Sequence, residues 1–270
     1  MLMAPLGHDP KLSNTFFAVM IAYLANYAIP RLGEVSRCGV LARYEKIPFA
    51  ESFGTVIIER LVDVFFFLLL VVLVFFLQFG KLYGFIANDF IPKLSEKLSS
   101  YSTLLYILAI AGALSLALLI IFRRRILNSL NSKMRKTLGG FKDGFKTIMK
   151  LKNPWLFVFH SVFIWFIYYV MLHLCFLCLT ETAGLSATCA LTTLLFGTLA
   201  VIITPGGLGA YPPAVALILS LYAIDSKTIG QAIGWLIWLS QFASILVFGA
   251  ISLVLLPLLN KENNAAQKQG

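Results

Sequence analysis

The chain has 270 residues, of which 59% are hydrophobic and 13% are charged, and its formal net charge is +10. This apolar content exceeds what the core of a soluble domain of that length can bury, so the composition excludes an ordinary soluble protein. We therefore expect an all-α fold, a polytopic bundle of transmembrane helices with the bilayer as its solvent.

Four apolar runs are long enough to cross the hydrocarbon core, which takes about 20 helical residues. They are residues 61–80, 102–122, 155–180 and 229–256. Two further runs, 12–30 and 187–204, are slightly shorter, and each stops at a proline, Pro30 or Pro205.

Two short runs, 47–58 and 214–224, predict half-helices. One follows the break at Pro30, and the other follows the sequence TPGGLGAYPP at 204–213. Broken apolar segments in corresponding positions of two halves are typical of a transporter binding site, because only protein or a water-filled cavity can satisfy the exposed backbone groups. We expect two interrupted or re-entrant segments of opposite sense, as in an inverted repeat. Ordinary loops between full spans are the alternative.

Residues 26–63 place five basic and five acidic side chains among these apolar runs. They are Arg31, Arg37, Arg43, Lys46, Arg60, Glu34, Glu45, Glu51, Glu59 and Asp63. An ionisable group at membrane depth costs about 2.5 to 3.5 kcal/mol on insertion scales, so such groups are usually paired and often mark a transport pathway.

Within that stretch, Glu34 and Arg37 are three residues apart, so on a helix they share a face and are predicted to pair. Arg31 and Arg37 are predicted to hold a lipid phosphate, because the guanidinium fork matches phosphate oxygens. A merely juxtamembrane, solvated pair is the alternative.

Glu59 and Asp63 are four residues apart, which is unfavourable for two anions on one helix face unless Arg60, another cation or the helix N-terminus compensates. In the second break, glycines at 206, 207 and 209 would let the backbone approach a headgroup or a neighbouring helix closely.

Ten of the 22 Lys and Arg residues lie between 123 and 152. By the positive-inside rule this segment is cytoplasmic, and the charged stretch 31–60 then opens toward the cytoplasm. Apolar residues recur every three or four positions over 123–153, so we also expect a basic amphipathic helix on the anionic inner leaflet. Nucleic-acid binding is disfavoured. One transmembrane domain is expected over 1–259, with a polar cytoplasmic tail at 260–270.

These motifs, taken in order, resemble a known family. The string N-x3-P-R-x-G-E-x2-R comprises Asn26, Pro30, Arg31, Gly33, Glu34 and Arg37, and it precedes Glu59, Arg60, Asp63 and the PGGLG of Pro205, Gly206, Gly207 and Gly209. The combination is similar to the lysylphosphatidylglycerol synthetase transmembrane-region family, the flippase-like membrane proteins, over about residues 14–256.

The resemblance implies an inner-membrane protein that moves a phospholipid or lipid-linked headgroup between leaflets, with the residues just named as its lipid-binding and translocation site. Larger members of the family carry a soluble C-terminal aminoacyltransferase domain, whereas only a short tail follows Leu259 here. We therefore expect no lysyl transfer by this chain alone. The alternatives are a membrane module of an aminoacyl- or glycosyl-lipid synthase on another chain and a structural membrane protein without transport.

Family members also carry two further helices before the position of Leu2, so the sequence is expected to lack an N-terminal part of the family domain. Cys175 and Cys178 form a C-x2-C in an apolar run without a second ligand pair, which favours core packing over zinc. The sequence has no phosphate-binding loop and no zinc-protease motif, so we expect no cofactor, metal or ATP-driven step. The expected partners are a membrane phospholipid and a lipid-modifying enzyme; the oligomeric state stays open.

Overall fold

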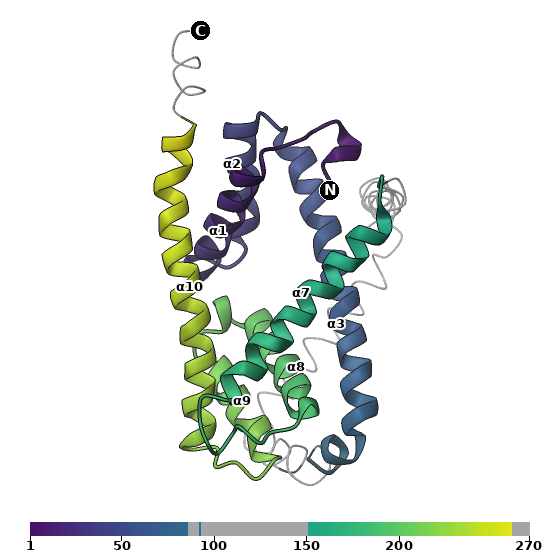
Figure 1. The fold of residues 1–270 in the computed structure, drawn as a ribbon, viewed down its shortest axis with the longest axis vertical. Helices are drawn as coiled ribbons and strands as arrows, with labels where there is room; N and C mark the ends of the chain where they lie inside the picture. The colour runs from purple at the N-terminus through teal and green to yellow at the C-terminus, as the bar shows by residue number, and fades with distance from the viewer. Residues whose placement is uncertain (86–91, 93–150, 261–270) are drawn as a thin grey trace, which may run out of the picture. The chain divides into compact units, whose positions relative to one another are not determined.

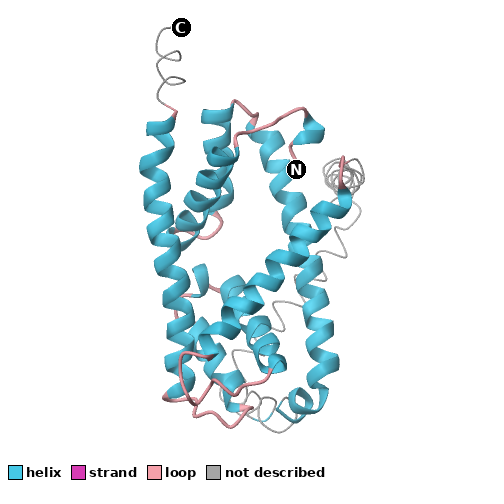
Figure 2. Ribbon diagram, in the orientation of Figure 1, coloured by secondary structure: helices cyan, strands magenta, loops and turns pink. Residues whose placement is uncertain are grey.

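The computed structural model describes residues 1–85, 92 and 151–260. Every regular element in these ranges is a helix, which confirms the all-α class (Figure 2). The predicted span 102–122 and the basic segment 123–150 lie outside the described residues. The chain divides into two compact units, residues 1–77 with 147–270, and residues 78–146. The elements below belong to the first unit, except that α3 runs on into the second.

The first break lies between α1 (Leu12–Ala28) and α2 (Leu32–Glu45). Ile29 is extended, with a φ of −139°, as expected for a residue that precedes a proline. Arg31 then takes the left-handed conformation, with a φ of 65°. These two conformations end one helix and start the next, and α1 packs along α2 as an antiparallel pair that we call the first hairpin.

The third helix, α3 (Phe49–Phe85), has 37 residues and one non-helical residue, Gln78. The predicted half-helix 47–58 is therefore wrong, because residues 49–58 continue into the apolar run 61–80 without a break. The sequence between them, ERLVD, carries no proline or glycine that would interrupt a helix.

After the undescribed segment come α7 (Pro154–Phe176) and α8 (Ala187–Ile203). The second break follows, with the 3-10 turn η3 (Pro205–Gly207) and the helix α9 (Tyr211–Ser220). Gly206, Gly207 and Gly209 all have positive φ, a region that glycine enters at little cost. We call α8, η3 and α9 the second hairpin.

The last helix, α10 (Ile229–Leu259), has 31 residues and packs against both hairpins (Figure 1). A Cβ atom at Gly249 would lie 2.9 Å from Cβ of Leu24 in the first hairpin, and one at Gly234 would lie 2.6 Å from Cα of Pro212 in the second. These glycines let the backbones approach closely, as small residues do between membrane helices.

A buried polar network ties the end of α10 to the first hairpin. Asn14 and Asn260 exchange amide hydrogen bonds of 3.0 and 2.9 Å, and Asn14 also donates to Glu45 at 2.5 Å. Asn14 is 2% exposed and Asn260 is 4% exposed. Since unpaired buried amides are costly, this network fixes where α10 ends relative to α1 and α2.

Three described helices are long and apolar enough to cross a membrane: Phe49–Lys81 of α3, α7 and α10. Their outer faces carry large exposed apolar side chains, such as Phe76, Phe159 and Leu253. A soluble protein could not leave so much apolar surface in water, so the chain is a membrane protein.

Candidate functional site: a charged cluster beside the first helix break

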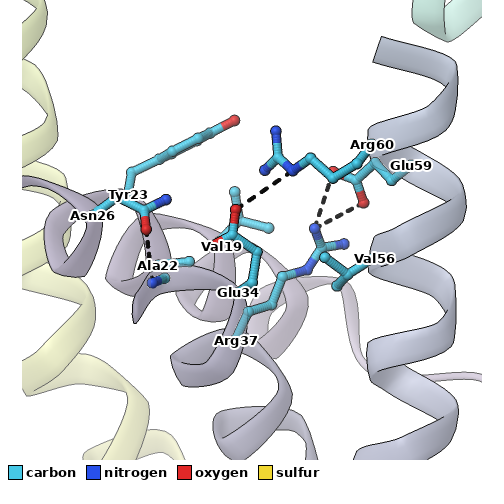
Figure 3. Close-up of a pocket in the computed structure, with 10 residues that line it drawn as sticks. Val19, Ala22, Tyr23, Asn26, Glu34, Arg37, Val56, Glu59 and Arg60 are labelled. Carbon is cyan, nitrogen blue, oxygen red and sulfur yellow. Dashed lines mark hydrogen bonds and ion pairs between the residues drawn. The ribbon is translucent and has the colours of Figure 1, made fainter. Parts of the chain in front are cut away.

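A small, partly open recess lies where the first hairpin meets α3 (Figure 3). It is lined by Val19, Ala22, Tyr23, Asn26, Gly33, Glu34, Arg37, Val56, Glu59 and Arg60. Six of these are among the predicted site residues: Asn26, Gly33, Glu34, Arg37, Glu59 and Arg60. The sequence motifs therefore converge in space.

The strongest interaction in the recess joins Arg37 of α2 to Glu59 of α3. Nη1 of Arg37 donates to both carboxylate oxygens of Glu59, at 3.0 and 2.8 Å. The Arg37 side chain is only 16% exposed. Charge-assisted bonds of this length are about twice as strong as neutral ones, and they gain further where water is scarce.

A second set of contacts centres on Arg60. Its Nε lies 3.5 Å from Oε1 of Glu34, and its Nη1 donates to Oδ2 of Asp63 at 3.2 Å. One guanidinium thus bridges a carboxylate of α2 and a carboxylate of its own helix. Asp63 does not line the recess itself but belongs to the cluster through this bond.

The charge pairs differ from those the spacing predicts. Glu34 and Arg37 do share a face of α2, yet among the described residues each has its ion pair with α3 instead of with the other. An i,i+3 pair contributes only a few tenths of a kcal/mol, so a better-placed partner on a neighbouring helix outcompetes it.

The repulsion between Glu59 and Asp63 is compensated because each has its own arginine, as the need for a compensating cation predicts. The alternative of compensation by the helix N-terminus is wrong. Helix α3 begins at Phe49, so Glu59 lies well beyond the first turn, where the dipole acts.

Asn26 and Gly33 shape the wall of the recess that lies at the helix break. The amide oxygen of Asn26 accepts a 2.8 Å hydrogen bond from the backbone N–H of Gly33, one of the unpaired donors at the start of α2. A Cβ atom at Gly33 would collide with the backbone oxygen of Ala22 and with the Asn26 amide. Only glycine therefore fits between α1 and α2 here.

Two buried polar atoms in the recess have no partner, Oε2 of Glu34 and Nε of Arg37. Such atoms are costly unless something satisfies them, and functional sites are where they persist. The recess thus offers a ligand one acceptor and one donor. The five charged side chains comprise two cations, Arg37 and Arg60, and three anions, Glu34, Glu59 and Asp63.

Tyr23 completes the lining from α1. Its side chain interacts with that of Tyr168 of α7, so a further helix contributes to the surroundings of the recess. The sequence reasoning missed Tyr23, although positions 19, 22, 23 and 26 recur at helical spacing before the Pro30 break. Tyr168 carries no such signal, because it lies in a long apolar run.

The remaining predicted site residues lie elsewhere. Pro30 and Arg31 are exposed at the turn and do not line the recess. Pro205, Gly206, Gly207 and Gly209 form the turn of the second hairpin, also outside the recess. The predicted C-x2-C residues are a half-buried Cys175 and an exposed Cys178, both free thiols. Within the described residues, no three His, Cys, Asp or Glu side chains form a group that could hold a metal ion.

Comparison with known proteins agrees with this architecture. A sequence profile of the family described as "Lysylphosphatidylglycerol synthase TM region" matches residues 1–249. The UPF0104 membrane protein MJ1595 of Methanocaldococcus jannaschii is 26% identical over 265 residues, which cover 93% of this chain and 77% of that protein. No solved structure matches the chain.

Proposed function

The chain belongs to the lysylphosphatidylglycerol synthase transmembrane-region family, and from this premise we propose that it binds the headgroup of a phospholipid or lipid-linked substrate and moves it between leaflets. The observation that supports this most is the charged cluster of Glu34, Arg37, Glu59 and Arg60, which lies beside a broken helix and keeps two buried polar atoms without partners. In a cluster that served stability alone, two unpartnered buried atoms on charged side chains would be an uncompensated cost.

We infer that the headgroup binds by exchange. Arg37 already has a carboxylate partner, so a lipid phosphate must take the place of one Glu59 oxygen or use the unpaired Nε. The bidentate fork of arginine suits either arrangement. A hydroxyl or amino group of the same headgroup would satisfy Oε2 of Glu34, which an anion alone cannot do.

For orientation, we propose that the basic segment 123–153 and the C-terminus lie in the cytoplasm and that the protein resides in the inner membrane. The proposal rests on the concentration of Lys and Arg in that segment. A cysteine introduced near Lys136 should react with a membrane-impermeant reagent only from the cytoplasmic side, and one near Glu96 only from outside. Labelling of both from the same side would contradict this topology.

The function is tested in reconstituted vesicles with a fluorescent phospholipid, whose outer-leaflet fraction is quenched by a membrane-impermeant reductant. Wild-type protein should carry inner-leaflet probe to the outer leaflet, where the reductant quenches it. Glu34→Gln and Arg37→Ala should abolish this additional quenching, although both variants insert in the membrane. Transfer at the wild-type rate in both variants would show that the cluster is peripheral to lipid movement.

The second hairpin needs a different test, a bulky residue in its turn. We expect Gly207→Leu to slow transfer, because its φ is 78° and its Cβ would lie 3.1 Å from both Val201 and Tyr211. The matched control is Gly39→Leu, on an exposed position of α2 with open space around it. Gly249 is unsuitable as a control, because it packs closely on Leu24.

The alternative function is that of a membrane module that serves a lipid-modifying synthase on another chain. The description of the matching family names a synthase, which favours this candidate specifically. The two candidates differ in a deletion strain. Loss of a synthase module would remove a modified lipid, whereas loss of a flippase would leave that lipid present but confined to one leaflet. Purified protein is expected to show no aminoacyl-tRNA-dependent lysine transfer to phosphatidylglycerol.

A further inference from the structure

The turn ends of the two hairpins meet at an aromatic residue, Tyr27. Tyr27 lies in the last turn of α1, and its ring faces Gly206 of η3 so closely that a Cβ atom at Gly206 would lie 2.6 Å from its Cε1 atom. Gly206 also has a φ of 58°, so the turn depends on glycine for its backbone as well as for this contact.

A tryptophan of α10 fixes the same turn from another side. Nε1 of Trp238 donates to the backbone oxygen of Gly206 at 2.8 Å. The Trp238 ring stacks on Phe242 at 5.2 Å and meets the edge of Tyr27 at 6.2 Å. Trp238 is 5% exposed. Three packed rings therefore hold an otherwise permissive glycine turn in one arrangement.

Tyr27 connects this turn to the charged cluster through its neighbour in the chain. Asn26 precedes Tyr27, and its amide oxygen accepts the N–H of Gly33, the residue before Glu34. Both residues lie in the last turn of α1, and the Tyr27 ring is packed against Trp238 and Phe242, which restrict its side-chain rotation. A displacement of the ring that this rotation cannot absorb therefore moves the backbone of the last turn and, with it, Asn26.

We propose that Tyr27 and Trp238 are positioning residues that couple the glycine turn of the second hairpin to the charged cluster of the first. When the turn rearranges, the Tyr27 ring moves, the bond from Gly33 to Asn26 weakens, and Glu34 shifts relative to Arg60. The significance of this coupling for lipid movement rests on the proposed function. The coupling itself is a property of the contacts and can be measured without any lipid substrate.

Hydrogen exchange of the full chain in detergent, followed by mass spectrometry of peptides that cover residues 29–37, reports on the amide of Gly33. Gly206→Ala pushes a methyl group into the Tyr27 ring. Trp238→Phe removes the hydrogen bond to Gly206 and keeps a smaller aromatic ring where the indole stacks on Phe242. Both variants should accelerate exchange in this peptide about two- to tenfold, the range expected when one hydrogen bond weakens.

Gly209→Ala is the matched control. Gly209 lies in the same turn and has a φ of 74°, but a Cβ atom there would meet open space and not Tyr27. It should disturb the turn and leave exchange over 29–37 at the wild-type rate. A second check combines Gly206→Ala with Tyr27→Ala, which removes the collision and should not add to the acceleration caused by Tyr27→Ala alone.

The proposal is overturned if Gly206→Ala and Trp238→Phe alter the hydrogen-exchange rate only in peptides around residues 200–211. Equal acceleration by Gly209→Ala would also overturn it, because strain anywhere in the turn would then suffice. Acceleration by Gly206→Ala without any by Trp238→Phe would remove Trp238 from the coupling. Absence of lipid transfer by the wild type in vesicles would count against the proposed function alone and would leave the exchange result to decide the coupling.

Discussion

Helices α1 and α8 both have 17 residues and both end two residues before a proline, yet the chain that follows them differs in chemistry. After Pro30 the first hairpin brings Arg31, Glu34 and Arg37, whereas after Pro205 the second brings three glycines. A helix interrupted by proline exposes backbone groups in both cases. The first hairpin surrounds its break with charged side chains, and the second surrounds its break with a backbone that can adopt many conformations.

The two hairpins also satisfy their polar groups differently. The charged side chains of the first hairpin bond to other helices, as Arg37 does with Glu59. In the second hairpin, the hydroxyls of Thr192, Thr198 and Thr204 donate to carbonyl oxygens four residues earlier in their own helix. The first hairpin therefore depends on other helices for its charged groups, while the second satisfies these hydroxyls within its own helix and takes an outside bond at Gly206, from Trp238.

The largest effect expected from this difference is at Gly33. Gly33→Ala places a Cβ atom against the backbone oxygen of Ala22, which cannot move aside, and should lower the free energy of unfolding by about 3 kcal/mol. Gly197→Ala in the second hairpin meets only the ring of Tyr211, at 2.7 Å, and should cost less because a side chain can shift. Thermal unfolding in detergent measures both, with Gly39→Ala as the unstrained control. Equal losses of unfolding free energy for Gly33→Ala and Gly197→Ala would show that the two hairpins tolerate an added methyl group equally.

The ion pair of the first hairpin should show the next largest effect. Arg37→Ala leaves Glu59 without its partner and should destabilise the protein by about 2 kcal/mol, less than a fully buried pair because Glu59 is 36% exposed. Replacing both residues by methionine should restore most of that stability, since an apolar pair needs no partner. Lipid transfer should remain absent in the double variant. If transfer returned with stability, the charges would be structural only.

A small effect of opposite sign is expected in the second hairpin. The hydroxyl of Thr193 is buried and unpartnered, so Thr193→Val, which keeps the shape of the side chain, should leave stability unchanged or raise it by up to about 1 kcal/mol. Lipid transfer should be unaffected. A marked loss of either property would mean that this hydroxyl has a partner in the membrane and that the second hairpin is less self-sufficient than its internal hydrogen bonds suggest.

The smallest effect concerns the loop that leads from the second hairpin into α10. Hydrogen bonds from Thr228 and Lys227 hold the pKa of the exposed Asp225 carboxyl below its ordinary value of 3.8. Because the folded pKa is depressed, the stability that Asp225 contributes is present above pH 3.8 and is lost as the pH falls through the lower, folded pKa. The difference in melting temperature between wild type and Asp225→Ala should therefore shrink from about pH 6 to about pH 3. A constant difference would exclude this carboxylate as the cause.

Much of the fold follows from the sequence because apolar length and proline position are strong local signals. They predict α1, α8 and the two breaks to within a few residues. The unbroken α3 differs from the expectation of a half-helix at 47–58 followed by a separate span at 61–80, although no helix-breaking residue lies between them. Within the site, the participants on α2 and α3 were predicted from their charge and spacing.

The partners within the site could not be predicted, because they depend on how helices pack across the chain. The pairing of Arg37 with Glu59 and the contact of Tyr27 with Gly206 join residues whose sequence separation gives no periodic signal. Tyr27 and Trp238 also belong to residue types that are common in membrane helices, so nothing in their local sequence distinguishes them from lipid-facing side chains. The inverted repeat and the one-domain organisation stay predictions.

The amide pair between Asn14 and Asn260 has a consequence for biogenesis. The two residues are 246 positions apart, so the ribosome adds the partner of Asn14 long after Asn14 itself. Until Asn260 has been added, Asn14 of the first hairpin has Glu45 as a hydrogen-bond partner and lacks its bonds with Asn260. The charged hairpin is therefore complete only once α10 has been added, and until then its unpaired buried amide is a defect that quality-control proteases can recognise.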